Sequence, residues 1–494
     1  MGASFCARCR SERSRGGVVG KLRSSAGVSP RRVAGFACHQ GFLYSLFYMG
    51  MNREYSIGSF AVERVELLGT LAAMVVTLVV MNVMARRAPS VREVMLERHS
   101  VIAYAVALVI GAFVPVVMGS LQTDELVFES IMVGVPWALM LLAWTRRLAR
   151  GTTEKSTVEV FVGAGVGAAL CFLVYLVPAP QAQWALKLLA IPSAVLLAVD
   201  MRKVDAEAEE ARPEASVSTS AATDFSVKVL AGTVCFGLAA GFMEAYNSNP
   251  GTAAMASFPA SLLLFVLFCA GALQALLASD VRVRGGLDGA YRLALLVMMA
   301  GFLFSPVLEG SGVPGGAIVL AGYLGLTSTL VSLFLAFSKI VAEDPARTVA
   351  RGFLALFGGE AAGVMLANVS NAFALSGTTP YVIVCFAGLA TLFAYLFLFT
   401  ERDFKTLSEI ARTADYFEEA CAVIAKEAGL SKREAEILPL ALRGRTSERI
   451  AGELFISKST VDTHLRRIYA KADVHGRQEL IDLGEKTAER IASR

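Results

Sequence analysis

The chain has 494 residues, of which 55% are hydrophobic, with a mean hydropathy of +0.57 and a formal net charge of +4. This length allows several domains, and this apolar content is too high for an ordinary soluble enzyme. The net charge of the whole chain is small, so the distribution of charge along the sequence is more informative.

The first 32 residues are rich in Arg, Ser and Gly and contain one acid, Glu12. They include a Cys6-x-x-Cys9 pair with no second Cys or His pair near it, so we expect no metal site there. The apolar run that follows lacks a small-residue cleavage site typical of a signal peptide. We interpret residues 1–32 as a basic disordered tail, or as residues upstream of the true start.

From residue 33 to residue 400 the chain is a series of apolar segments, each long enough (~17–25 residues) to cross a bilayer as a helix. The pattern predicts an all-α bundle of about twelve spans, near residues 33–51, 66–85, 101–119, 126–145, 158–177, 183–200, 225–246, 256–279, 291–308, 313–338, 347–370 and 380–400. His39 and Gln40 interrupt the first span. The sixth is short and begins with Trp184 and Lys187, which can reach the membrane interface.

A polar segment, residues 201–224, separates a first transmembrane half (33–200) from a second (225–400). Its glutamates, proline and Ser/Thr-rich stretch are typical of a solvated cytoplasmic linker. Six spans, a linker and six further spans resemble the topology of the major facilitator superfamily, whose halves are parallel repeats. No signature sequence of that superfamily is present, so the resemblance concerns topology alone.

Basic residues are concentrated in every second connection between spans. These connections lie within residues 86–98, 146–155, 202–212, 282–284 and 339–347. The other connections carry Arg53 and Arg64 in the first loop and no base after them. Loops rich in Lys and Arg stay in the cytoplasm, so an even number of spans places both termini there. We therefore expect a multi-pass protein of the cytoplasmic membrane.

Glycines and cysteines within the spans have structural interpretations. Glycine patches predict close contacts between helices, at Gly163-x-Gly165-x-Gly167, Gly237-x-x-x-Gly241 and Gly359-x-x-x-Gly363. Single cysteines in apolar runs indicate neither disulfides nor metal ligands; they are Cys38, Cys171, Cys235, Cys269 and Cys385.

Two acids inside spans are candidates for a sensing site, because an unpaired charge within a bilayer is costly. Glu360 lies near the middle of the eleventh span, beside Gly359, and we interpret it as functional or as part of a buried network. Glu244 lies toward the outer end of the seventh span. We interpret it first as an interfacial residue facing water, and second as part of a polar pocket with Glu360.

Residues 401–424 are expected to form a connecting helix. Its apolar residues recur at intervals of four and three, in a heptad-like seam of Ile410, Ala414, Phe417, Cys421, Ile424 and Ala428. Two interpretations remain open: a helix that packs on the domain after it, and a dimerising signalling helix.

The last segment, residues 425–494, has the pattern of a helix-turn-helix. Ser431 and Glu434 form a capping box ahead of an apolar-periodic helix that ends at Gly444. Thr446 can cap a second short helix, and Ser457 can cap a third after a tight turn. Two short helices joined by three or four residues, the second one basic, are typical of this motif.

The third helix has one apolar face and one polar face. Val461, Leu465 and Ile468 recur at intervals of four and three and are expected to point to the core. Short polar groups and bases lie elsewhere on the helix and are candidates for reading base edges and holding phosphates: Lys458, Ser459, Thr460, Asp462, Thr463, Arg466, Arg467 and Lys471. We expect Arg466 to contribute to base preference and Lys471 to contact phosphate.

A dense series of residues in this segment matches one family pattern: Leu430, Ser431, Arg433, Glu434, Gly444, Ile450, Ala451, Leu454, Ile456, Ser457, Thr460, Val461, His464, Ile468, Tyr469, Lys471, Arg477, Glu479 and Leu480. On these residues the segment resembles the C-terminal DNA-binding domain of LuxR-type transcription regulators. The resemblance implies a four-helix domain whose third helix reads DNA and whose fourth, from Arg477, pairs two protomers.

The segment departs from the family pattern at two places. Ala472-Asp473 replaces the common Leu-Gly after the third helix. Asp462 stands where a base is frequent, and its carboxylate could accept from a cytosine amino group or repel phosphate.

These features together predict a membrane-bound transcription regulator and not an enzyme. The bundle would sense a ligand or membrane signal, and the C-terminal domain would bind double-stranded promoter DNA as a homodimer. The lipid bilayer, RNA polymerase and an unknown small molecule are the other expected partners, and no cofactor or metal is expected. The alternative is a membrane transporter with a fused regulatory DNA-binding domain.

Overall fold

The computed structural model describes residues 28–49, 53–57, 60–118, 123–177, 180–205, 219–246, 258–277, 286–308, 315–340, 344–373 and 379–492. The chain divides into two compact units. Unit 1 comprises residues 1–201, 218–338 and 343–408, and unit 2 comprises 202–217, 339–342 and 409–494. Most of the expected tail (1–32) and linker (201–224) lies outside the described residues.

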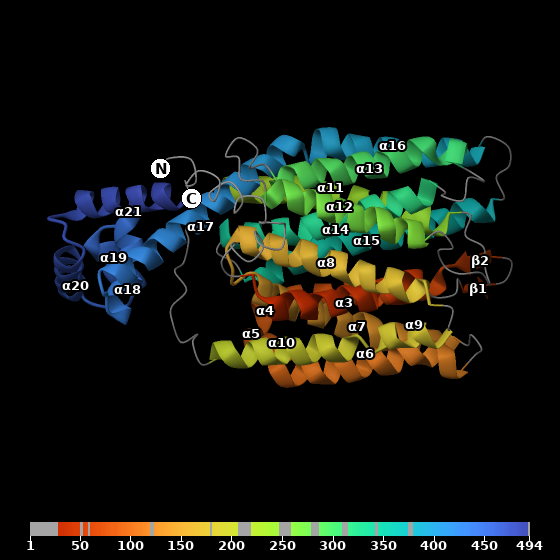
Figure 1. Ribbon diagram of the computed structural model, residues 1–494, viewed down its shortest axis with the longest axis horizontal. Coiled ribbons are helices and arrows are strands. Elements are labelled where there is room, and N and C mark those ends of the chain that lie inside the picture. The colour runs from red at the N-terminus through yellow and green to blue at the C-terminus, as the bar shows by residue number, and fades with distance from the viewer. Residues whose placement is uncertain are drawn as a thin grey trace, which may run out of the picture. The chain divides into compact units, whose positions relative to one another are not determined.

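Unit 1 is a bundle of long helices with one short hairpin (Figure 1). Its elements are α3 (Pro30–Tyr48), β1 (Glu54–Ile57), β2 (Phe60–Glu63), α4 (Val65–Arg87), α5 (Pro89–Met95), α6 (Arg98–Met118), α7 (Thr123–Leu148), α8 (Thr153–Tyr175), α9 (Pro180–Lys187), α10 (Ala190–Asp205), α11 (Thr219–Ala245), α12 (Phe258–Leu277), α13 (Gly286–Leu308), α14 (Gly315–Ile340), α15 (Pro345–Ala372), α16 (Thr379–Phe393) and a π-helical turn, η2 (Ala394–Leu398).

Ten helices among the described residues are long and apolar enough to cross a membrane. An eleventh is added if the helix from Val382 to Leu398 is counted with the helix after it. The prediction of about twelve spans is therefore confirmed approximately. The difference is α3, in which His39 and Gln40 interrupt the apolar run. Both residues are buried, and His39 stacks on Trp137 of α7 with ring centroids 4.9 Å apart. Protein encloses α3, so these polar groups do not face lipid.

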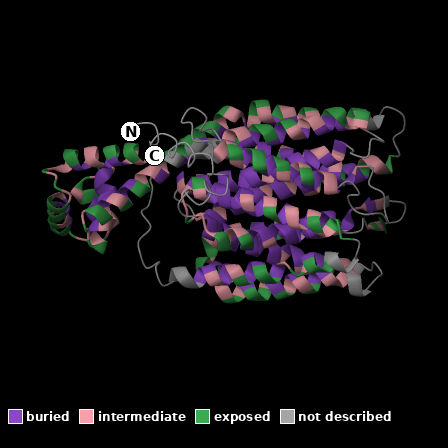
Figure 2. Cartoon of the chain, in the orientation of Figure 1, coloured by how far each residue is buried: buried purple, intermediate pink, exposed green. Residues whose placement is uncertain are grey.

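Large apolar side chains remain exposed on the outer faces of the bundle, for example Val76, Leu303 and Phe386. Figure 2 shows buried residues filling the interior, with exposed residues on the outward-facing sides of the helices. An apolar surface of this extent is unfavourable in water and suits contact with lipid tails. Together with the spanning helices, it identifies unit 1 as a membrane region.

Helix contacts repeat between the two halves of unit 1. In the first half α3 packs on α8, and in the second half α11 packs on α15. In spanning order each pair is the first and fifth helix of its half. Between the halves α4 packs on α15 and α12 packs on α8. In each case the second helix of one half contacts the fifth helix of the other. This repetition is the arrangement expected of two parallel repeats.

An ion-pair cluster joins the two halves at Asp344. The Asp344 carboxylate caps α15 by accepting from the backbone N–H of Ala346 at 3.1 Å. It also pairs with Arg146 of α7 at 2.5 Å and with Arg92 of α5. Arg146 binds the Glu93 carboxylate with both terminal nitrogens at 2.7 Å. One acid of the second half is thereby fixed to two bases of the first.

The α11 and α15 backbones touch through glycines, as the spacing predicted. A Cβ at any of four glycines would collide with a backbone carbonyl of the other helix: Gly237 with Leu356, Gly241 with Glu360, Gly359 with Val234 and Gly363 with Leu238. The lack of a side chain at Gly163 and Gly167 similarly lets α3 pack closely against α8. The prediction of close contacts is confirmed at these positions.

The hairpin is the one departure from an all-α fold among the described residues. Strands β1 and β2 are antiparallel, with Tyr55 opposite Val62. The chain then enters α4 through Arg64, which has a left-handed backbone (φ 55°).

Unit 2 is all-α. Helix α17 (Glu401–Glu427) begins in unit 1, and its residues from 409 onward belong to unit 2. It is followed by α18 (Lys432–Leu442), α19 (Ser447–Glu453), α20 (Lys458–Lys471) and α21 (Arg477–Ala492). Their apolar faces share one core, which includes Ile437, Leu438, Ile450, Val461, Leu465, Ile468 and Leu480.

Candidate functional site

The helix starts of unit 2 are fixed by local side-chain caps. Ser431 and Glu434 form the expected capping box at α18, with reciprocal side-chain to backbone hydrogen bonds. The Thr446 hydroxyl accepts from the backbone N–H of Arg449, and the Ser457 hydroxyl accepts from that of Thr460 at 3.1 Å. The three predicted caps are confirmed, and they set the angle at which α20 follows α19.

Helix α20 has a buried apolar face and a polar exposed face, as predicted. Val461, Leu465 and Ile468 are buried in the core of unit 2. Asp462 is half-buried. The other candidate residues are exposed: Lys458, Ser459, Thr460, Thr463, Arg466, Arg467 and Lys471.

The candidate bases of α20 differ in their partners. Lys458 pairs with the Glu448 carboxylate of α19, and the same hydrogen bond is the first cause of a lowered pKa of Glu448. Arg466 and Arg467 make neither an ion pair nor a hydrogen bond with any described side chain. Two exposed guanidinium groups beside short hydroxyl side chains form a surface suited to phosphates and base edges.

Lys471, expected to contact phosphate, is bound within the domain. Its ammonium donates to the buried Glu434 carboxylate at 2.6 Å and to the backbone carbonyl of Gly429 at 3.2 Å. The hydrogen bond from Lys471 is the largest cause that lowers the pKa of Glu434 to about 2, with further lowering by the backbone and hydroxyl of Ser431. Burial acts in the opposite direction. The ion pair therefore fixes the end of α20 to the start of α18.

The departure at Asp473 has a structural consequence. Asp473 follows α20 with a left-handed backbone (φ 53°), and the N–H of Val474 donates to the Tyr469 carbonyl at 3.0 Å. This is a helix end at which glycine is ordinarily favoured. The common Leu-Gly would meet this geometry without strain, whereas the Cβ of Asp473 does not.

The last part of α17 packs on the helix-turn-helix core. Cys421 and Ile424 are buried in that core, and Phe417 packs against it. The Arg443 guanidinium lies 5.0 Å from the centroid of the Phe417 ring. Ile410, at the start of the predicted seam, is exposed. Of the two open interpretations, packing on the domain accounts for the burial of Phe417, Cys421 and Ile424.

In unit 1 the two candidate acids share one buried cluster. The Glu360 carboxylate of α15 accepts from the Tyr323 hydroxyl of α14 at 2.6 Å. The Glu244 carboxylate of α11 accepts from the Tyr48 hydroxyl of α3 at 3.4 Å. Glu360 is 2% exposed and Glu244 is 4% exposed. Our first interpretation of Glu244, an interfacial residue facing water, is therefore wrong: protein encloses its side chain, and the second interpretation, a polar group shared with Glu360, fits its burial.

Arg64 completes this cluster, and the sequence interpretation missed its role. We placed it in an outer loop, but its side chain is 0% exposed and interacts electrostatically with Glu244 and with Glu360. One terminal nitrogen donates to the Phe47 carbonyl at 2.8 Å, and Nε lies 3.3 Å from the Glu66 carboxylate. We refer to Tyr48, Arg64, Glu244, Tyr323 and Glu360 as the acidic cluster.

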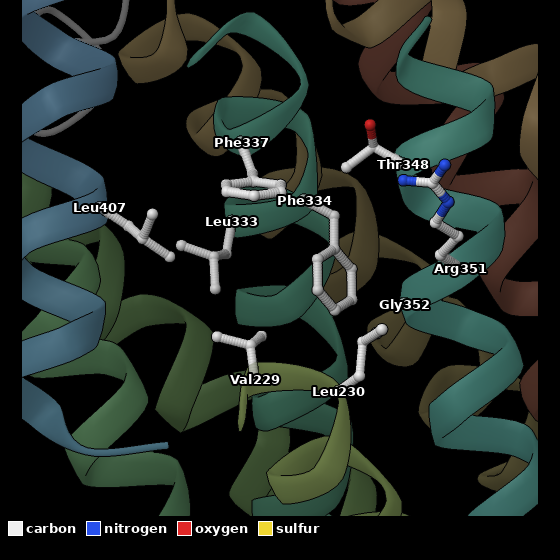
Figure 3. Close-up of a pocket in the computed structure, with 9 residues that line it drawn as sticks. All are labelled: Val229, Leu230, Leu333, Phe334, Phe337, Thr348, Arg351, Gly352 and Leu407. Carbon is white, nitrogen blue, oxygen red and sulfur yellow. The ribbon is translucent and has the colours of Figure 1, made fainter. Parts of the chain in front are cut away.

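A separate pocket lies near the other ends of α11 and α15 (Figure 3). Apolar side chains dominate it, with Thr348 and Arg351 at one side. Its internal space is about 20 Å³, which is room for about one water molecule. The lining residues are Val229, Leu230, Leu333, Phe334, Phe337, Thr348, Arg351, Gly352 and Leu407. In this form it is too small for an organic ligand.

Comparison with known proteins places a family match in unit 2. The sequence profile described as "Bacterial regulatory proteins, luxR family" matches residues 428–483. The oxygen regulatory protein NreC of Staphylococcus haemolyticus is 44% identical over 57 residues, which is 12% of this chain and 26% of NreC. The uncharacterized response regulatory protein YgeK of Escherichia coli is 47% identical over 62 residues, 13% of this chain and 40% of YgeK. The match thus spans about a quarter of NreC and less than half of YgeK.

Two solved transporters are similar in structure to this chain at low scores. The human organic anion transporter MFSD10 has a TM-score of 0.39 and 13% identity, over 78% of this chain and 99% of that one. The Escherichia coli fucose:proton symporter FucP has a TM-score of 0.31 and 12% identity, over 71% of this chain and 97% of that one. These scores are too low to show a shared fold.

Proposed function

We propose that this chain, whose residues 428–483 form a LuxR-family helix-turn-helix domain, is a membrane-bound transcription regulator that senses a signal through its helix bundle. The observation that carries the proposal concerns the described residues: ten helices long and apolar enough to cross a membrane occur in one chain with an α20 surface whose two guanidinium groups, of Arg466 and Arg467, pair with no described side chain. Such a surface suits promoter DNA, and the bundle keeps the chain in a bilayer.

The expected location is the cytoplasmic membrane, with both termini in the cytoplasm. The supporting feature is the alternation of basic connections in the sequence. In this orientation unit 2 reaches DNA, and the acidic cluster lies toward the outer side. Glu244 is near the last residue of α11, and residues 247–252 follow it in a connection free of bases.

Signal transfer is proposed to act on the pairing of two protomers. Two domains held together occupy two half-sites at once, and the second binding step then benefits from a high effective concentration. A ligand or membrane signal that changes the bundle would change this pairing through α17, which contributes residues to both units. RNA polymerase would contact the DNA-bound dimer.

A transporter with a fused regulatory domain is the second candidate. The specific observation in its favour is the repeated contact of first and fifth helices in both halves, with exchanged contacts between the halves. Transport would require the ion pairs of Asp344 with Arg92 and Arg146 to open and close.

One experiment separates the two candidates. The full chain, reconstituted in vesicles, is tested for uptake of the compounds that induce transcription of its own operon, and in detergent for binding to that operon's promoter. Specific, salt-sensitive DNA binding without uptake supports the regulator. Uptake without specific DNA binding contradicts it and supports the transporter.

A further inference from the structure

We propose that the acidic cluster is a binding site for one monovalent positive charge, either a proton or a small monovalent cation, and that its occupancy is the input the bundle senses. This proposal rests on the proposed function for its biological meaning, but the site itself is argued from geometry. A proton and a small monovalent cation have the same chemistry here, because each places one positive charge between the carboxylates of Glu244 and Glu360.

The first argument is the balance of charge. Glu244 and Glu360 are two carboxylates in the interior of the bundle, and Arg64 is the base, among the described residues, that interacts with both. Arg64 also lies 3.3 Å from a third carboxylate, that of Glu66. One guanidinium therefore faces three acids. A buried carboxylate with no full counter-charge is unfavourable in a low dielectric, and an added proton or cation removes that cost.

The second argument is an unsatisfied oxygen atom. Each acid has one tyrosine donor, Tyr323 for Glu360 and Tyr48 for Glu244. Oε2 of Glu244 is buried and accepts no hydrogen bond from the described residues. A carboxylate oxygen without a donor has capacity to carry a proton or to bind a cation placed beside it.

The third argument is position. Tyr48 of α3 and Arg64 at the start of α4 come from the first half, whereas Glu244, Tyr323 and Glu360 come from the second. A charge bound here contacts both halves at once. The two acids are also held at a fixed separation, because the glycine contacts keep the backbones of α11 and α15 together.

Further unsatisfied atoms lie on α3 and α7, close to Phe357 of α15. Nε2 of His39 and Nε1 of Trp137 are buried without a hydrogen-bond partner among the described residues. The Trp137 ring lies 5.9 Å from that of Phe357, which precedes Glu360 by one turn of α15. Polar atoms without a hydrogen-bond partner among the described residues therefore also lie in the interior near the acidic cluster.

The test measures thermal unfolding of the purified full chain in detergent. One series varies pH at constant sodium, and a second replaces sodium with choline at constant pH and ionic strength. We expect the melting temperature to fall as pH rises if the charge is a proton, because a buried acid must then ionise without a partner. We expect it to fall on removal of sodium if the charge is a metal cation. No dependence in either series would overturn the proposal.

Variants show whether the dependence arises at this site. Glu244→Gln and Glu360→Gln each keep the shape and remove a negative charge, so each should lose the shift seen in the native chain. Glu129→Gln is the matched control, since Glu129 is also buried in the bundle but is paired with Arg53 at 2.6 Å. It should keep the shift. Equal loss in all three variants would assign the effect to buried acids in general and overturn the proposal.

A binding measurement separates this site from the proposed function. DNA binding by the native chain is measured under the same two series. A matching change in DNA affinity, absent in Glu360→Gln, supports both. A shift in melting temperature with no change in DNA affinity keeps the cation site and contradicts its role as the signal.

Discussion

The ammonium group of Lys471, the last residue of α20, lies 2.6 Å from the carboxylate of Glu434, in the first turn of α18. The carboxylate is buried and also serves the capping box of Ser431. A base at the end of the helix that we propose to contact DNA is thus part of the internal structure of the domain. This gives Lys471 a role in stability that its position on the helix did not suggest.

Glu434→Gln should lower the free energy of unfolding of unit 2 by about 1.5–3 kcal/mol, the range for hydrogen bonds to a charged group. The effect depends on pH. The pKa of Glu434 is lowered from 4.5 to about 2 on folding, so its contribution is complete above pH 4.5 and is lost as the pH falls toward 2. Chemical denaturation of native and variant domains across this window measures the difference, which should disappear at the acid end. Glu436→Gln, which breaks the half-buried i,i+3 pair with Arg433, should cost less, about 0.5–1 kcal/mol.

Arg466 and Arg467 should affect DNA binding in different ways. Arg466→Ala should relax base preference at one position, by about 1–3 kcal/mol of discrimination. Arg467→Ala should weaken all sequences alike and reduce the slope of log affinity against log salt by about 0.9, as expected for one lost phosphate contact. Titrations over several salt concentrations and single-base variants of the site distinguish the two. Lys486→Ala removes the same charge from the exposed side of α21 and should leave both quantities unchanged.

Asp473→Gly should stabilise unit 2. The left-handed backbone costs an L residue about 1–2 kcal/mol, and the greater entropy of glycine in the unfolded chain offsets part of that gain, so we expect about 0.5–1 kcal/mol. Gly444→Ala is the reverse control. Gly444 has φ 72° and open space around its Cα, so the substitution adds backbone strain alone and should destabilise by about 1 kcal/mol. Destabilisation by Asp473→Gly would show that the aspartate side chain stabilises this helix end.

A fragment of residues 409–494 should fold more stably than one of residues 425–494. The shorter fragment lacks Phe417, Cys421 and Ile424, which pack in or against the core. Their loss should cost on the order of 3–6 kcal/mol, from about 1.5–3 kcal/mol for each of the two large apolar side chains, those of Phe417 and Ile424. Denaturant unfolding of the two fragments tests this, and Ile424→Ala in the longer one should reproduce part of the difference. Equal stability of the fragments would mean that α17 adds nothing to the domain.

Topology reporters test the proposed orientation. A reporter fused within residues 247–252 should signal from outside the membrane, and one within 205–220 from the cytoplasm. The basis is the alternation of Lys and Arg between the connections. The opposite result at either position would reverse the bundle and remove unit 2 from the side on which DNA lies.

Features set by neighbouring residues were predictable from the sequence. The caps at Ser431, Thr446 and Ser457 depend on residues two or three positions away, and the faces of α20 follow from helical spacing. The glycine contacts of α11 and α15 were predictable as contacts because only glycine admits a second backbone so closely. The sequence did contain a hairpin signal that our prediction left out. Gly58-Ser59, a dipeptide typical of two-residue hairpin turns, separates two short segments of four residues.

Features made by distant residues were not predictable. Arg64 is a single base just before an apolar run, with Glu63 and Glu66 near it, which is the usual pattern of a charged interfacial segment. Its partners Glu244 and Glu360 lie far along the chain, so its burial follows from the packing of the two halves. Lys471 and Glu434 are 37 residues apart, and no periodicity links them. In both cases protein groups from other helices replaced the solvent that the local pattern implied: an ion pair for Lys471, and electrostatic interactions with two buried acids for Arg64.

The shared core of α17 and the helix-turn-helix limits how this protein can be switched on. Some membrane-held regulators could be activated by proteolytic release of their soluble part. A cut within residues 409–424 would here remove side chains from the core of the released piece, which would lose stability as it became free. Release would leave the core intact only if the cut fell before residue 409, so cleavage within residues 409–424 is not an activating step and activity is expected while the chain is still attached to the bilayer. The domain would then search only DNA that comes close to the membrane, so the chromosomal position of its target promoters becomes part of the control.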